Sequence, residues 1–453
     1  MKPIITGKST ELWGQFFNFK SPQIRTFHLT WLAFFLCFFG WFGLAPMMPV
    51  ITKELSLTDK QVAFILTASV SMTVLGRIII GWVCDRIGPR ITYSALLVFG
   101  ALPVGLVGLS SSYEALLVSR LAIGLIGASF VVTQYHTSVM FAPNIVGTAN
   151  ATSAGWGNLG AGTANLLVPI VFAALIAKPL GVSEFMSWKL TMIIPAVGMF
   201  IMGFIYYFFT QDYPEGNLKD LKKLKDPLKE SLDKDRQKAS FWSAVKDYRV
   251  CALFLIYGAC FGLELTINGF AVVYFTGSFQ LDLTTAGFLA FLFGSMNLFA
   301  RTLGGVYGDR FGIKWGLKGR VAFLGAVLLL EGISLIVFSQ MNAIVLVVSS
   351  MMVFSIFVKM AQGATYSIVP FINKKAMGTV AGIVGAGGNM GAVVAGLIFA
   401  YYTKSEYSTV FMILGIAVAV ISGLALTVRF SEKAEKEAHA NIQLGLAKVQ
   451  AEA

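Results

Sequence analysis

The chain has 453 residues, of which 56% are hydrophobic and 13% are charged, and its mean hydropathy is +0.73. Soluble domains carry about 25% charged residues, so this composition excludes an ordinary soluble protein and indicates one that crosses a membrane many times. The net charge of +12 does not indicate a nucleic-acid partner, because the basic residues gather in the tails and in the loops of one side. The four cysteines lie in or beside apolar segments without metal-ligand spacing, so we expect neither a metal nor a cofactor.

Apolar runs of membrane-spanning length follow one another along the chain, six before a charged segment and six after it. They lie at 27–50, 61–83, 91–110, 114–137, 148–176 and 188–209, and then at 250–275, 283–307, 320–340, 343–369, 377–402 and 406–429. The sequence therefore predicts an all-α membrane protein with twelve transmembrane helices.

These runs divide the chain into five parts. We expect an N-terminal cytoplasmic segment (1–26), a six-helix bundle (27–209), a cytoplasmic linker (210–249), a second bundle (250–429) and a cytoplasmic tail (430–453). Of the 35 lysines and arginines, 26 fall in the tails, the linker and the loops at 84–90, 308–320 and 370–376, five lie on the opposite side and four lie within spans. Cytoplasmic loops carry the excess of basic residues, so both termini are predicted to be cytoplasmic.

One pattern occurs twice, at the same place in each bundle. The first copy reads Arg77-x3-Gly81-x3-Asp85-Arg86-x-Gly88, and the second reads Arg301-x3-Gly305-x3-Asp309-Arg310-x-Gly312, offset by 224 residues. A duplicated half with a binding site between the copies is a common plan of transporters. The repeat therefore predicts two pseudo-symmetric six-helix bundles.

Arg77 and Arg301 lie in apolar stretches, where a cation is costly and usually functional. Each is eight residues from its aspartate, which places it about 12 Å into the membrane at ~1.5 Å per residue. A guanidinium presents a planar fork of N–H donors that suits a planar oxyanion. We interpret the two arginines as a paired anion site; the structural alternative is that helix carbonyls or a carboxylate satisfy them.

Other repeated residues fall near the same depth. Phe130 and Tyr366 occupy matching places in the fourth and tenth spans, and flat rings there would sandwich a flat anion or simply pack in the core. Asn158 and Asn389 lie in glycine-rich motifs of the fifth and eleventh spans. Their amides are expected either to donate to the anion or to serve helix packing, for which small residues are typical.

Four further residues within the spans are candidates for substrate binding or proton coupling. Tyr257, which offers a hydroxyl, and Phe261 share one face of the seventh span. Glu264 in that span is either a proton carrier or the permanent partner of a buried cation. Lys359 precedes Tyr366 by seven residues and shares its face, so we expect it to add positive potential or to couple to protons.

The G-x-x-x-D-R-x-G element at 81–88 and 305–312 resembles the loop motif of the major facilitator superfamily. In that family the motif links the cytoplasmic ends of neighbouring helices and helps to set the conformational equilibrium. The resemblance implies gating roles for Asp85, Arg86, Asp309 and Arg310.

Two glycine-asparagine segments carry a more specific resemblance. AGWGNLGAG at 154–162 and GAGGNMGAV at 385–393 closely resemble the paired nitrate signatures of the nitrate/nitrite porter family, a branch of the same superfamily. The resemblance extends over 27–429 and implies the major facilitator fold, nitrate bound by the paired arginines, and flanking aromatic rings. Tyr366 departs from some members, which have phenylalanine there.

The resemblance implies a secondary active transporter of nitrate and nitrite, not an enzyme, in the bacterial cytoplasmic (inner) membrane. We expect a monomer with no nucleic-acid partner, whose partners are nitrate or nitrite, protons and the lipid bilayer. Uptake of an anion against an inside-negative potential costs about 2.3 kcal/mol per charge per 100 mV, so accumulation needs more than one proton per nitrate or exchange for another anion. Glu264 and Lys359 favour proton symport; nitrate/nitrite antiport is the alternative, followed by a carboxylate exchanger or a nitrate receptor that does not transport.

Overall fold

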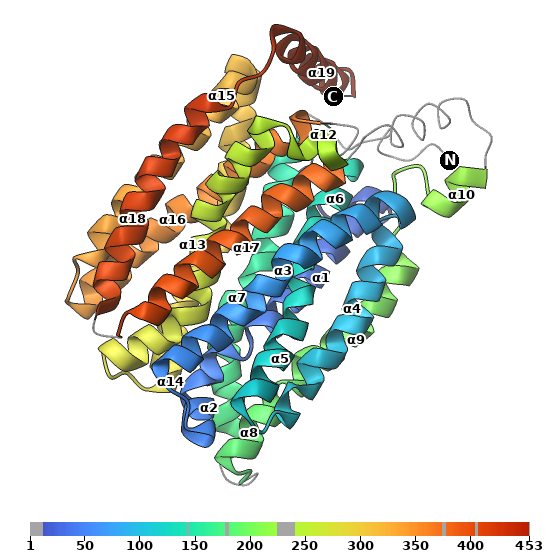
Figure 1. Cartoon of the computed structure of the whole chain (residues 1–453). Coiled ribbons are helices and arrows are strands. Elements are labelled where there is room, and N and C mark those ends of the chain that lie inside the picture. The colour runs from blue at the N-terminus through green and yellow to red at the C-terminus, as the bar shows by residue number, and fades with distance from the viewer. Residues whose placement is uncertain are drawn as a thin grey trace.

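The structure, a computed structural model, describes residues 12–142, 145–176, 181–223, 241–373, 377–403 and 406–452. Regular secondary structure in these residues is helical (Figure 1). Eleven segments are long and apolar enough to cross a membrane, and one of them, Leu283–Ser339, has 57 residues and contains two spans. This agrees with the predicted all-α membrane protein of twelve transmembrane helices.

The first bundle is built from helices that run back and forth along one axis. Its helices are α1 (Pro22–Phe42), α2 (Met48–Leu55), α3 (Asp59–Ile87), α4 (Pro89–Leu106), α5 (Tyr113–Gly124), α6 (Ser129–Met140), α7 (Val146–Ile176), α8 (Glu184–Thr191) and α9 (Ile193–Phe209). A 3₁₀ turn at Leu125–Ala128 separates α5 from α6 within one span. The turn places Phe130 just beyond an irregular stretch of backbone, at a depth where helix carbonyls are free to accept hydrogen bonds from side chains.

The second bundle repeats this plan. Its helices are α13 (Tyr248–Ser278), α14 (Leu283–Ser295), α15 (Ala300–Ser339), α16 (Ile344–Ile368), α17 (Met377–Tyr401) and α18 (Tyr407–Ser422), with a 3₁₀ turn, η8, at Gly423–Thr427. The short helices α10 (Leu218–Lys223) and α12 (Phe241–Val245) and the tail helix α19 (Glu432–Glu452) lie at one end of the two bundles (Figure 1). Residues 1–11 of the predicted N-terminal segment and 224–240 of the predicted linker lie outside the described residues.

The predicted loop at 308–320 is helical instead. α15 continues through it, and the helix is broken only at Gly316, whose φ is 70° and ψ is −159°. A positive φ of this kind favours glycine because a Cβ would be strained there. The turn is held by the tail, since the Glu435 carboxylate accepts a hydrogen bond from the Leu317 N–H at 2.9 Å. Sequence hydropathy located the polar stretch correctly but not its helical backbone.

The two bundles meet along matching pairs of helices. α3 packs against α17, and α7 packs against α14, α15 and α16 (Figure 1). The approach of α7 to α14 is close enough that a Cβ on Gly162 would lie 2.8 Å from the Gly294 Cα. Small residues permit this contact, and it brings the residues of both repeats to a common interface.

Candidate functional site

Arg77 on α3 and Arg301 near the start of α15 face the same pair of aromatic rings. Both arginines are fully buried. The guanidinium carbon of Arg77 lies 4.7 Å from the ring centroid of Phe130 and 4.9 Å from that of Phe261. For Arg301 the corresponding distances are 5.4 and 5.7 Å. The two cations of the repeat therefore share one cation–π environment at the interface of the bundles.

Arg77 connects its own bundle to the other one. Its Nε donates to the Gly127 carbonyl at 3.3 Å, and its Nη1 donates to the Gly385 carbonyl of α17 at 2.5 Å. Its Nη2 is buried and has no acceptor. Backbone carbonyls thus fix Nε and Nη1 of the guanidinium, whereas the N–H groups of Nη2 have no acceptor in the protein.

Arg301 is held by side chains of its own bundle. Its Nη1 donates to Gln362 Oε1 at 2.6 Å, and its Nη2 donates to the Tyr257 hydroxyl at 2.9 Å. Its Nε is buried and has no acceptor. Each arginine of the pair therefore offers one unused N–H group, in a region from which water is excluded.

The aromatic side chains form a compact cluster around the arginines. Phe130, Tyr257 and Phe261 stack on one another with ring centroids 5.0–5.8 Å apart. Tyr366 lies edge-on to Phe130, with an interplanar angle of 85°, and its hydroxyl donates to the Ala381 carbonyl at 3.0 Å. Tyr257 and Phe261, which sequence reasoning placed on one face of a helix, both lie nearly parallel to Phe130. Tyr366 closes the cluster from the side.

The glycine-asparagine motifs supply both space and unused polar groups. A Cβ on Gly388 would lie 2.5 Å from the Phe261 ring, so a glycine is needed for α17 to pack against it. Asn389, the next residue, is fully buried, and neither its Oδ1 nor its Nδ2 has a partner. Asn158 is also buried; its Nδ2 lies 3.5 Å from Glu264 Oε2 and its Oδ1 has no partner.

Glu264 is surrounded by cations and amide donors. Asn297 Nδ2 donates to its Oε1 at 2.5 Å, and Lys359 Nζ lies 3.6 Å from the same oxygen. Arg301 Nη1 lies 3.9 Å from Oε2. The Lys359 ammonium also lies 3.5 Å from the Phe293 ring centroid. Every group of this charged cluster is fully buried, and Arg301 belongs both to this cluster and to the arginine pair.

The residues with a predicted gating role take two different positions. Asp309 accepts hydrogen bonds at 2.7 Å from the backbone N–H and the hydroxyl of Thr148, at the beginning of α7, and from Arg320 at 2.6 Å. Asp85 accepts a hydrogen bond at 3.3 Å from Thr379, at the beginning of α17. Each aspartate thus reaches the third residue of a helix in the opposite bundle, where free N–H groups favour an anion.

The arginines of the same motif lie at the surface. Arg86 stacks on Trp82 at 3.9 Å and Arg310 lies 5.7 Å from the Tyr307 ring, so each contacts an aromatic ring of its own helix. Their predicted gating role stays a prediction.

Sequence reasoning missed several residues of the site. Gln362 and Asn297, which hold Arg301 and Glu264, carry no charge and have no identical counterpart in the other repeat. The Gly127 and Gly385 carbonyls, which accept hydrogen bonds from Arg77, were not predictable, because every residue has a backbone carbonyl. Glu331 on α15 is a fully buried acid. The sequence could have indicated it, because it interrupts the apolar run LLLEGISL, and acids within membrane spans are usually functional.

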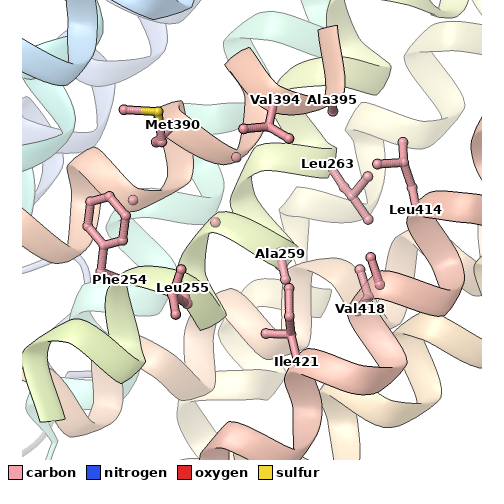
Figure 2. A pocket seen from close by; sticks show the side chains of 14 residues that line it. Phe254, Leu255, Ala259, Leu263, Met390, Val394, Ala395, Leu414, Val418 and Ile421 are labelled. Atoms are coloured by element: carbon pink, nitrogen blue, oxygen red, sulfur yellow. The ribbon is translucent and has the colours of Figure 1, made fainter. Parts of the chain in front are cut away.

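An apolar groove lies on the outer side of the same helices. It has a volume of about 220 Å³ and is lined by residues of α13, α17 and α18, among them Leu255, Met390 and Val394 (Figure 2). No charged side chain lines it, so it is distinct from the anion site. Among the described residues, no group of three or more His, Cys, Asp or Glu side chains is placed to hold a metal ion.

Comparison with known proteins shows which family has this architecture. The chain matches the Major Facilitator Superfamily over residues 30–372 and 254–451. It is 36% identical over 404 residues to high affinity nitrate transporter 2.5 of Arabidopsis thaliana, covering 88% of this chain and 79% of the relative. It is 30% identical to the nitrate/nitrite transporter NrtP of Nostoc punctiforme, covering 88% and 91%.

Solved structures share the fold at low identity. The proton:xylose symporter XylE superposes with a TM-score of 0.69 at 13% identity, covering 90% of this chain and 96% of that one. The human organic anion transporter MFSD10 gives a TM-score of 0.61 at 18% identity, covering 89% and 99%.

Proposed function

Because this chain belongs to the major facilitator superfamily, and within it to the nitrate/nitrite porter family, we propose that it carries nitrate across the bacterial cytoplasmic membrane. It is a transporter and not an enzyme. We further propose that nitrite is a second substrate, that both termini face the cytoplasm, and that the protein works as a monomer.

The observation that carries the proposal is the pair of unused donors. Arg77 Nη2 and Arg301 Nε are buried without a protein acceptor, and both guanidinium groups face Phe130 and Phe261. A buried N–H without an acceptor costs roughly 1–3 kcal/mol, and a planar anion with three equivalent oxygens removes that cost for both arginines at once. The free amide of Asn389 adds a further donor for the same ligand.

The same geometry supports alternating access. Two guanidinium groups in a dry region repel each other, and an anion bound between them offsets this repulsion and permits the bundles to close. Arg77 already reaches α17 of the opposite bundle through the Gly385 carbonyl. The contacts of Asp309 with Thr148 and of Asp85 with Thr379 close one end of the interface, and they must break when that end opens. Binding then favours the closed form through differential contacts, as coupling requires.

We propose proton symport as the source of energy. Nitrate uptake must overcome about 2.3 kcal/mol per charge per 100 mV, and a buried acid and base, Glu264 and Lys359, lie beside Arg301. Protonation in this cluster raises the positive charge that faces the anion, so proton and anion loading reinforce each other.

The test is nitrate uptake into proteoliposomes with an imposed pH gradient and no internal anion. Nitrate uptake together with protons supports the proposal. Uptake that begins only after nitrite or nitrate is loaded inside indicates an antiporter. Absence of nitrate movement under both conditions, with movement of formate or oxalate, would show a carboxylate exchanger instead, and nitrate binding without any flux would show a receptor.

A further inference from the structure

Glu331 is a second buried acid that the anion site does not use. It lies on the second half of α15, eight residues before the helix ends at Ser339, which is about 12 Å along the helix axis. Its side chain is fully buried, and neither carboxylate oxygen has a hydrogen-bond partner. An ionised carboxylate in such a place is strongly disfavoured unless it is paired.

The charges around Glu331 are few. Lys359 on α16 and Glu264 on α13 act on it electrostatically, and Cys260 on α13 faces it as well. The other helices packed on α15 bring no acid or base to this depth: α7 and η8 contain no titratable side chain, and α18 contains none beyond Tyr407. The tail helix α19 meets α15 at Leu317, about four turns away. Lys359 is therefore the one cation among the described residues that acts on both acids.

Glu264, by contrast, has several donors and cations beside it. It accepts hydrogen bonds from Asn297 and Asn158 and lies within 4 Å of both Lys359 and Arg301. Glu331 lacks all of these contacts, so protonation of its carboxylate breaks no hydrogen bond or close ion pair.

We propose that Glu331 is the carboxyl that takes up and releases a transported proton, and that Lys359 relays its charge to the anion site. The inference rests on the proposed nitrate transport. The step is a proton transfer in which only an O–H bond forms or breaks: a proton from outside neutralises the carboxylate and later leaves to the cytoplasm.

The relay follows from the position of Lys359. Lys359 Nζ lies 3.6 Å from Glu264 Oε1, and in the proposed relay this pairing belongs to the state in which Glu331 is protonated. When Glu331 is ionised, it competes with Glu264 for the Lys359 ammonium. Glu264 then interacts more strongly with Arg301, whose Nη1 lies 3.9 Å from Glu264 Oε2. Glu264 in that state competes with nitrate for Arg301. Protonation of Glu331 therefore strengthens nitrate binding, and by reciprocity nitrate binding promotes protonation of Glu331.

The experiment compares Glu331→Gln with Glu264→Gln in proteoliposomes, with the exposed Glu114→Gln as a matched control. Exchange of labelled nitrate for unlabelled nitrate reports the anion site without net proton movement. We expect Glu331→Gln to retain this exchange within about twofold, to lose nitrate accumulation under a pH gradient by at least about tenfold, and to lose the pH dependence of uptake. Glu264→Gln is expected to retain exchange but to make it independent of external pH, because it removes the charge that competes with nitrate for Arg301.

A Glu331→Gln protein that accumulates nitrate in response to a pH gradient as the wild type does would overturn the inference and leave nitrate transport standing. A wild-type protein without nitrate exchange would overturn the proposed function, and the inference with it. Proton uptake on nitrate binding, measured on the wild type by calorimetry in two buffers of different ionisation enthalpy, tests the inference even where the variant does not fold. Proton uptake supports it, and nitrate binding without proton uptake contradicts it.

Discussion

Replacement of Arg77 by lysine tests the paired-arginine site while retaining the charge. The guanidinium donates to the Gly127 and Gly385 carbonyls and keeps Nη2 for the anion. A lysine has a single nitrogen and no planar fork, so it is unable to serve both carbonyls and the anion from these positions. We expect nitrate binding to be lost or severely weakened in Arg77→Lys, and equally in Arg301→Lys.

The magnitude follows from the donors that are lost. A hydrogen bond to a charged group contributes about 1.5–3 kcal/mol, and every 1.4 kcal/mol changes an equilibrium constant tenfold. Loss of one donor to nitrate therefore raises Kd by roughly 10- to 150-fold. The Tyr366 hydroxyl is unable to replace the lost donor, because it donates to the Ala381 carbonyl. The Tyr257 hydroxyl, which accepts from Arg301, and the Asn389 amide are the same in the variant and the wild type, so they do not compensate for the loss.

The assay is isothermal titration calorimetry of nitrate with purified protein at neutral pH. Arg120→Lys is the matched control, because Arg120 is buried to the same extent and donates to the Trp41 carbonyl and the Ser69 hydroxyl rather than facing the anion site. The control is expected to lower Tm but to retain the wild-type Kd. A wild-type nitrate Kd in Arg77→Lys would refute the reasoning.

The remaining predictions concern the rings and the interface. Gly388→Ala should weaken nitrate binding by at least about tenfold, because the added Cβ would lie 2.5 Å from the Phe261 ring and displace it. Gly269→Ala is the control and should leave Kd unchanged, because no atom lies within 4 Å of its added Cβ. Equal Kd values in titrations of both variants would contradict this. Tyr366→Phe keeps the ring and removes one hydroxyl that donates to a helix carbonyl, so we expect a loss of stability of about 1 kcal/mol and less than a fivefold change in Kd, and a complete loss of binding would contradict that role. Thr148→Val removes one of the three donors to Asp309, and a loss of about 1 kcal/mol should shift the population toward the form open at this end about fivefold. Distances between spin labels on α7 and α15 measure this shift, and an unchanged distance distribution would show that the contact is not a gate.

The sequence was sufficient for the architecture and for the charged centre of the site. Twelve spans follow from hydropathy because a bilayer demands long apolar helices, and the two arginines stand out because cations are rare at that depth. The repeat then predicted that residues from both halves meet, and the structure places Arg77 and Arg301 on the same rings.

Other features depend on tertiary packing and had no sequence signal. The helical course of α15 through 308–315 depends on one glycine with positive φ and on a contact from the tail, neither of which hydropathy reports. Which rings lie parallel to Phe130 depends on how α13 and α16 pack against α6, because Phe261 and Tyr366 are equally aromatic in the sequence. The Gly127 carbonyl reaches Arg77 from a 3₁₀ turn of its own bundle, and the Gly385 carbonyl reaches it only where the two bundles meet.

The most direct test of the account is the position of bound nitrate in an experimentally determined complex. The account predicts a planar density between Arg77 Nη2 and Arg301 Nε, in contact with the rings of Phe130 and Phe261 and with both arginines within hydrogen-bond distance of its oxygens. Nitrate bound to one arginine alone, or elsewhere in the protein, would contradict the paired-arginine site.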